Sequence, residues 1–304
     1  MAAALPFALR DGVFIGIEEA ESGLACGCLC PACGEPVIAR KGTRRTHHFS
    51  HQRGAVCPDA LETTLHRMAK EILEQARRIR LPAVNLAQRE LVLFGEQWLP
   101  FEKVYVEKRL PGLQPDLIIE ARGKPVLVEI AVTHPTEWDK VRLLNRQRLA
   151  AIEIDLMTWS KDQEMRNQPI TRQSLRSCLL FSTAYKRWLF NPRRHYLEAA
   201  LRNTSDHKKV KRRYRQGHHR YTVSPCPLLR RIWRPSLGLS DGPTVSYADV
   251  FQDCLDCSFC LEINYRKEIR GFREIPTWPE TVICWGKWNG KEEAIIDTLL
   301  ATTR

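Results

Sequence analysis

The chain has 304 residues, of which 43% are hydrophobic and 27% are charged, and its formal net charge is +12. This length suffices for two or three domains that each bury a core. No run approaches the roughly 18 consecutive apolar residues of a membrane span. Arg10 and Asp11 interrupt an apolar N-terminus that lacks the basic start of a signal peptide. We therefore predict a cytoplasmic protein with no membrane partner.

Residues 1–58 predict a zinc-binding module of the zinc-ribbon type. Eleven cysteines in a chain without a signal peptide favour metal binding over disulfides. A CxxC knuckle begins at Cys30, and its two thiolates can bind one tetrahedral Zn²⁺. Because four protein ligands leave no open coordination position, the site is predicted to be structural; buried reduced cysteines are the alternative. The preferred ligands are Cys30, Cys33, His51 and Cys57, with His48 and Cys28 in reserve.

A helix is expected over residues 60–79, because the apolar residues of this segment fall on one stripe. Glu62 and His66 lie just beside the stripe and Lys70 lies further round. These polar side chains would therefore face the edge of the element against which the helix packs. Asp59 and Glu62 also have the spacing of a capping box, which gives Glu62 a purely structural alternative.

A linker containing Pro82 and a strand at 101–110 come next in the chain. Residues 113–134 then predict a β hairpin, since two apolar runs rich in β-branched residues flank a turn at Arg122 and Gly123. A helix at 136–151 and a strand at 152–156 are expected to follow. A helical crossover of this kind joins parallel strands, so residues 59–160 predict an α/β core with a mixed sheet.

Each strand of the hairpin carries a carboxylate where a core residue would be expected. If the loop is symmetric about Arg122 and Gly123, Asp116 lies directly opposite Glu129. Opposed side chains have Cβ atoms about 4.5–5.5 Å apart, and like charges there repel. Mg²⁺ or Mn²⁺ would offset this repulsion, because both ions bind carboxylate and phosphate oxygens. A three-residue loop would shift the register, and pairing with Arg122 or Lys124 is the structural alternative.

Residues 161–221 are expected to form a basic helical arm. Residues 161–240 contain 19 Lys and Arg against four acidic residues, so this segment carries the whole positive excess of the chain. Such a block is the electrostatic footprint of a polyanion, most simply nucleic acid. A solvated basic surface without a specific partner is the alternative. The candidate nucleic-acid-binding residues are Lys208, Lys209, Lys211, Arg212, Arg213, Arg215 and Arg220.

Residues 222–304 form a C-terminal module rich in Cys and Trp. A second zinc site is a candidate there, and reduced core cysteines are the alternative. The tryptophans are more typical of core packing than of base stacking. The candidate ligands are Cys254, Cys257, Cys226 and Cys284, although the choice of four among these and Cys260 stays open.

The order of elements, with Asp116 in a PD pair and an acid on the next strand, resembles the PD-(D/E)xK core of restriction-endonuclease-like nucleases. The zinc knuckle with HHFSH, the ETTLHRMAK helix and the VEIAVTH strand resemble the competence protein CoiA-like nuclease family over roughly residues 24–157. The resemblance implies that Asp116 and Glu129 hold the divalent ion, that Glu62 adds an acid, and that His66 orients a carboxylate or contacts phosphate.

One position departs from the superfamily pattern. The lysine expected two residues after the second acid is Ala131. Because related nucleases sometimes carry this lysine on a helix, Lys140 is the first candidate to replace it and Lys70 the second. His134 is a weaker candidate, and a surface charge is the alternative for Lys140.

Together these features predict a Mg²⁺- or Mn²⁺-dependent nuclease that hydrolyses phosphodiester bonds of DNA and carries one or two structural Zn²⁺ sites. A nuclease-fold protein that has lost its chemistry and only binds DNA or assembles with partners is one alternative. RNA as the substrate is another. Roles in DNA uptake, repair or anti-phage defence fit the sequence equally, and so do protein partners or a homo-oligomer.

Overall fold

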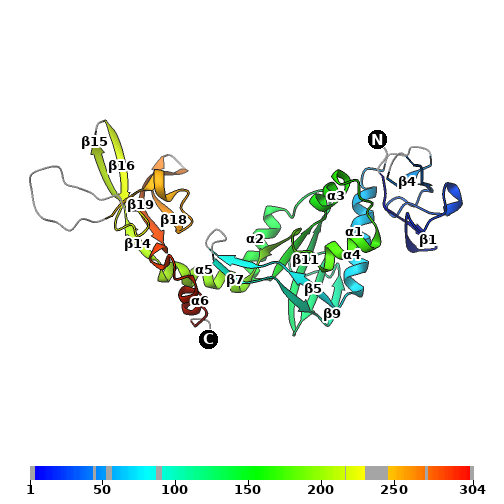
Figure 1. The fold of residues 1–304 in the computed structure, drawn as a ribbon, viewed down its shortest axis with the longest axis horizontal. Helices are drawn as coiled ribbons and strands as arrows, with labels where there is room; N and C mark the ends of the chain where they lie inside the picture. The colour runs from blue at the N-terminus through cyan, green and yellow to red at the C-terminus, as the bar shows by residue number, and fades with distance from the viewer. Residues whose placement is uncertain are drawn as a thin grey trace, which may run out of the picture. The chain divides into compact units, whose positions relative to one another are not determined.

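A computed structural model describes residues 4–43, 46–52, 57–86, 91–215, 217–229, 246–270 and 273–301. The chain forms two compact units (Figure 1). Unit 1 contains residues 1–83 and 95–192, and unit 2 contains residues 84–94 and 193–304. Within the described ranges, no helix combines the length and the apolar character needed to cross a membrane.

The N-terminal part of unit 1 is a small module of short strands. β1 (Phe7–Arg10) pairs with β2 (Val13–Gly16), and β3 (Val37–Arg40) pairs with β4 (His48–His51). A short 3-10 helix, η1 (Leu24–Cys26), lies between the two hairpins. The core of this module is small and is built around Phe49 and buried cysteines. Small cores often need a metal or another cross-link for stability.

The rest of unit 1 is built on a five-stranded mixed sheet in the order β13-β12-β11-β10-β9. All neighbours are antiparallel except β11 and β12, which run parallel because α2 (Trp138–Gln147) crosses over between them. The predicted α/β class is confirmed. The strands are β9 (Lys103–Val106), β10 (Leu117–Ala121), β11 (Lys124–Ala131), β12 (Ala151–Asp155) and β13 (Lys186–Phe190).

Helices cover both faces of this sheet, because successive side chains of a strand point to opposite sides. One face packs against α1 (Ala60–Gln75), α3 (Leu156–Met165) and α4 (Arg172–Leu180). The other face packs against α2 through Leu144. The first face includes Leu117, Ile119, Val128 and Ile130, and the second includes Ile118 and Leu127.

The β10–β11 hairpin turns over the two residues 122–123, Arg and Gly, whose φ angles are 51° and 72°. Positive φ at both positions is typical of the two-residue turns whose twist matches that of the flanking strands. The register pairs Leu117 with Val128. Continued by one residue, it sets Asp116 opposite Glu129, so the predicted register is confirmed.

Several boundaries differ from those expected. The first helix stops at Gln75, because Ala76 is extended with ψ of 160°. Residue 79 instead lies in a strand. The segment expected as a linker around Pro82 forms four short strands, since its apolar residues alternate with polar ones. They are β5 (Arg78–Leu81), β6 (Val84–Leu86), β7 (Leu91–Phe94) and β8 (Gln97–Pro100).

The elements around the hairpin are shorter than predicted. β9 covers only four residues of the expected 101–110, and Glu107 directly after it has a φ of 51°. α2 ends before Arg148, because Arg148 has a left-handed φ of 54°. The last four residues of the expected helix therefore lie outside α2. Residue 156 belongs to α3 rather than to the preceding strand.

The C-terminal boundary of the α/β core, expected at residue 160, lies near residue 192. The core extends this far because β13 pairs with β12 and completes the sheet. The expected helical arm is also wrong for its most basic part. The helices of the expected arm are the end of α3, α4 and α5 (Pro192–Thr204), and the described residues after α5 up to 221 contain no helix. β14 (Asp206–Lys209) follows α5, and β15 (Lys211–Arg215) and β16 (His218–Val223) form a hairpin with Gly217 in the turn at φ of 82°.

Unit 2 contains two three-stranded sheets in the orders β14-β19-β18 and β15-β16-β17. Its core joins valines of these sheets with Cys254 and Cys260. The remaining elements are β17 (Ala248–Asp249), the π-helix η3 (Val250–Cys254), β18 (Cys260–Arg270), β19 (Arg273–Cys284), the 3-10 helix η4 (Gly286–Trp288) and α6 (Glu292–Ala301).

Candidate functional site

The N-terminal module gathers the four preferred zinc ligands. The ligand atoms of Cys30, Cys33, His51 and Cys57 all lie within 4.8 Å of one another. Gly34 has a φ of 75°, and its amide donates to the carbonyl of Cys30, which closes the knuckle at 2.9 Å. These four residues could hold Zn²⁺, as predicted.

The two reserve ligands are engaged elsewhere. The thiol of Cys28 donates to the carbonyl of Cys26 at 3.2 Å, and His48 Nδ1 lies 2.9 Å from the carbonyl of Thr46. The pKa of the Cys57 thiol is raised to about 11, chiefly by burial and next by its hydrogen bond with Cys33. Zn²⁺ would displace the proton of such a thiol on binding.

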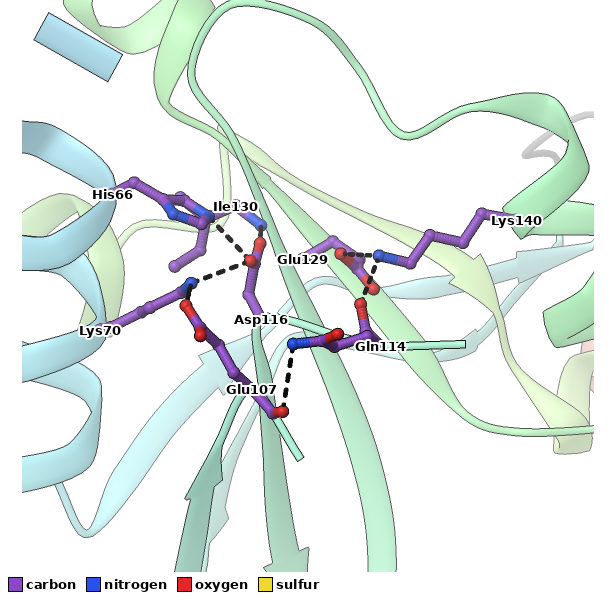
Figure 2. A network of polar contacts seen from close by, with 8 residues as sticks. All are labelled: His66, Lys70, Glu107, Gln114, Asp116, Glu129, Ile130 and Lys140. Atoms are coloured by element: carbon purple, nitrogen blue, oxygen red, sulfur yellow. Dashed lines mark hydrogen bonds and ion pairs between the residues drawn. The ribbon is translucent and has the colours of Figure 1, made fainter. Parts of the chain in front are cut away.

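Asp116 lies at the centre of a second polar cluster (Figure 2). Its Oδ1 is 2.8 Å from Nε2 of His66 and 3.2 Å from Nζ of Lys70, and its Oδ2 accepts the amide of Ile130 at 2.8 Å. Burial opposes ionisation, but the hydrogen bond from His66, its charge and the amide of Ile130 hold the pKa of Asp116 below its ordinary value. This carboxylate is therefore ionised at neutral pH.

Glu129 faces the opposite side of the cluster. Its Oε2 accepts a hydrogen bond from Nζ of Lys140 at 2.6 Å, and the same ammonium donates to the carbonyl of Gln114 at 3.1 Å. Burial raises the pKa of Glu129 to about 7, although Lys140 works against this rise. Its Oε1 is buried and has no hydrogen-bond partner among the described residues. A buried oxygen of this kind is rare and calls for an explanation such as an ion.

The basic side chains of the cluster come from helices on opposite faces of the sheet. α1 supplies His66 and Lys70, one turn apart on the same side of the helix, and α2 supplies Lys140 (Figure 2). Lys70 is 9% exposed in its side chain and also pairs with Glu107 at 2.7 Å. Both lysines that the sequence suggested as replacements thus contact the acidic pair, Lys70 through Asp116 and Lys140 through Glu129.

Glu62 and His134 lie beside the cluster rather than within it. The hydroxyl of Thr133 donates to Oε2 of Glu62 at 2.7 Å, and Nδ1 of His134 lies 3.0 Å from the same hydroxyl. Asp59 makes no side-chain capping bond at the start of α1, so the capping-box alternative for Glu62 is not formed. Glu62 instead ties α1 to the residues after β11.

Three participants were missed by sequence reasoning: Glu107, Gln114 and Glu153. Glu153 is 2% exposed and lies beside Glu129 on the parallel strand β12. Its carboxylate accepts hydrogen bonds from the amide of Thr136 at 2.6 Å and from Nε of Arg187 at 2.7 Å. The bond to Thr136 anchors the loop that leads into α2. A polar residue within the apolar run AIEID was the available signal for Glu153. The sequence contained no comparable signal for Glu107 and Gln114, because their contacts with Lys70 and Lys140 form only in the tertiary fold.

The basic segment forms a hairpin with two different faces. Arg213 lies directly opposite Arg220, so two positive side chains lie on the same face of the hairpin. On the other face, the guanidinium of Arg212 lies 2.8 Å from His219 and stacks over the ring of Trp278 at 5.0 Å. These aromatic contacts support the ribbon and leave its opposite face basic.

Lys208 does not belong to this basic face. Its side chain is 7% exposed, and its ammonium donates to the carbonyl of Pro225. A buried ammonium cannot reach a phosphate, so the structure contradicts its assignment to nucleic-acid binding. Lys209 and Lys211, by contrast, are exposed.

The second candidate zinc set is less compact. Among the described residues, only the N-terminal set has all its ligand atoms within 4.8 Å of one another. Cys226, Cys254, Cys257 and Cys284 nevertheless line one cavity of about 250 Å³ together with Cys260.

These features define a protein with an N-terminal Cys/His set that could hold Zn²⁺ and an α/β unit in which His66, Lys70 and Lys140 surround the acids Asp116 and Glu129. Residues 23–60 match the family model of the competence protein CoiA N-terminal domain. The match includes all four residues of the N-terminal zinc set and ends before the acidic cluster. A search of curated proteins and a search of solved structures each found no match.

Proposed function

We propose that this protein is a divalent-metal-dependent nuclease acting on DNA, with its centre at Asp116 and Glu129. The observation that carries the proposal is the free Oε1 of Glu129, buried beside an ionised Asp116. Hard oxygen ligands of this type suit Mg²⁺ or Mn²⁺. The match to a competence-protein domain supports a role connected with DNA.

The residues present divide the work of phosphodiester hydrolysis in a consistent way. Asp116 and Glu129 would hold the ion, which supplies an activated water and positive charge for the phosphate. His66 orients Asp116 through its hydrogen bond at 2.8 Å. Lys140 lies 2.6 Å from Glu129 and takes the part of the lysine that Ala131 replaces, where it can polarise a water or neutralise phosphate charge.

The test is cleavage of labelled single- and double-stranded DNA, with RNA in parallel, in Mg²⁺, Mn²⁺ or EDTA. We expect cleavage of DNA with either metal and none in EDTA. Asp116→Asn should also remove cleavage, since it removes the negative charge but keeps the shape of the side chain. Cleavage of RNA alone would change the substrate. Tight DNA binding without cleavage in any metal would favour the non-catalytic alternative, which Ala131 keeps open.

Lys140→Ala is expected to lower the cleavage rate by about 100-fold, the scale typical of removing one electrostatic interaction with the transition state. Single-turnover rates at saturating Mg²⁺ measure this decrease. Arg142→Ala is the matched control, because Arg142 lies on the same helix and pairs with Asp139 at 3.3 Å. An unchanged rate in Lys140→Ala together with a decrease in Lys70→Ala would transfer the role to Lys70.

The double change Arg213→Ala and Arg220→Ala is expected to weaken DNA binding at every sequence tested. For each phosphate that the variant no longer neutralises, the slope of log K against log salt should become shallower by about 0.9. Fluorescence anisotropy between low and high salt measures the slope. Lys291→Ala, an exposed lysine of the same unit, should leave it unchanged. An unaltered slope in the double variant would show that another surface binds the DNA.

A further inference from the structure

Two segments of unit 2, residues 254–260 and the end of β19, contribute four cysteines to the lining of one cavity. Cys254 ends η3, Cys257 lies in the turn that follows, Cys260 begins β18 and Cys284 ends β19. Cys260 and Cys284 are register partners on neighbouring strands. All four line the same cavity of about 250 Å³.

The backbone around these thiols is folded as in a metal knuckle. The amide of Cys257 donates to the carbonyl of Cys254 at 3.3 Å, and the amide of Cys260 donates to that of Cys257 at 2.9 Å. Two tight turns in succession therefore curl the CxxCxxC segment round one point. The amide of Gly286 donates to Sγ of Cys284 at 3.3 Å, an outer contact of the kind that orients and stabilises a thiolate ligand.

Lys208 supplies a second, independent observation. It is buried and lines the same cavity, and its ammonium donates to the carbonyl of Pro225. The nearest carboxylate, that of Asp206, lies 3.9 Å away and also pairs with Lys287 at 3.1 Å. Opposite charge nearby stabilises a buried cation. Zn²⁺ bound by four thiolates carries a net charge of −2 and would add such charge, whereas four neutral thiols would not.

Cys226 also lines the cavity, but its amide donates to the carbonyl of Ser246 at 3.1 Å and takes no part in the two turns of the CxxCxxC segment. Cys260 closes the second of these turns on Cys257 and pairs in register with Cys284. Cys260 is therefore the better fourth ligand than the Cys226 that the sequence suggested.

We infer that unit 2 holds a second, structural Zn²⁺ through Cys254, Cys257, Cys260 and Cys284. Lys208 offsets the charge of this centre from within the core. The inference is independent of nuclease activity, because the cavity belongs to unit 2 and the acidic cluster to unit 1.

The experiment is metal analysis of the purified full chain by mass spectrometry. We expect two Zn²⁺ per chain in the wild type, one in Cys257→Ser and one in Cys33→Ser. Cys226→Ser is the matched control and should retain two. Substitution with Co²⁺ separates the sites without any activity assay, because Cys33→Ser should keep the stronger thiolate charge-transfer absorption of a four-sulfur centre.

Cys257→His guards against simple misfolding, since it keeps a ligand and should retain two metals with a changed Co²⁺ spectrum. One Zn²⁺ per wild-type chain, unchanged in Cys257→Ser, would overturn the inference. So would a disulfide among these four cysteines, seen as two fewer alkyl groups on the unfolded chain when it is alkylated without prior reduction. Loss of zinc in Cys226→Ser with retention in Cys260→Ser would overturn the ligand assignment.

Discussion

Glu129→Gln is expected to abolish metal-dependent cleavage and, at the same time, to stabilise the metal-free protein. Loss of the carboxylate charge removes an ion ligand, so activity should fall by more than the roughly 10- to 100-fold typical of a residue that only supports a ligand. Gln can still accept the hydrogen bond from Lys140. The decrease in activity is measured as the single-turnover cleavage rate in Mg²⁺.

The stability gain follows from the raised pKa of Glu129, about 7 against an ordinary 4.5. Between these pH values the folded protein keeps a proton that the unfolded chain has released. Stability therefore falls as the pH rises through this window, and the ionised carboxylate is unfavourable above it. Removing the charge should recover up to about 3 kcal/mol at pH 8 and almost nothing at pH 4.

Thermal unfolding in EDTA at both pH values measures this difference as a shift in Tm. Glu120→Gln is the matched control, because Glu120 lies on the neighbouring strand but pairs with Lys103 at 3.5 Å at a more exposed position. It should change neither the cleavage rate nor the pH dependence of Tm. A Glu129→Gln protein less stable than wild type at pH 8 would show that the pair with Lys140 outweighs the burial of the charge.

Cys33→Ser is expected to release the N-terminal zinc and unfold the module around it. Structural Zn²⁺ contributes about 10–16 kcal/mol to the folding of small zinc domains, and the core of this module is small. The unfolding should spread, because Phe7 and Phe14 of the module pack into the large core against α1. Zinc content and limited proteolysis with mass spectrometry measure both effects, and the first new cleavages should fall within residues 4–52.

Cys28→Ser is the matched control for this change. Cys28 is more deeply buried in the module than Cys33, and its thiol donates to the carbonyl of Cys26, a bond that a serine hydroxyl can also make. It should retain zinc and resist the protease. Full zinc content in Cys33→Ser would contradict the ligand set of Cys30, Cys33, His51 and Cys57.

The sequence-based predictions that the structure agrees with depend on local patterns in the chain. The Arg122–Gly123 turn determines the register of its own hairpin, so the opposition of Asp116 and Glu129 could be read from residue numbers alone. The CxxC spacing likewise placed two ligands of the N-terminal zinc set. Both features depend on contacts between residues close together in the chain. Element boundaries were less predictable, because single residues such as Ala76 and Glu107 end the helix or strand through their backbone conformation.

The tertiary structure alone decided which charged residues surround the acidic pair. Lys70 and Lys140 lie on helices that cover opposite faces of the sheet. The sequence suggested both as candidates for one role, but only the packing showed that each lysine contacts a different acid. The same holds for Lys208, which basic composition assigned to a surface and the fold buries beside the cysteines. The sequence by itself therefore determined the two carboxylates, the zinc knuckle and the α/β order of elements. The packing of helices on both faces of the sheet determined their partners, because those contacts join segments that local chain geometry cannot relate.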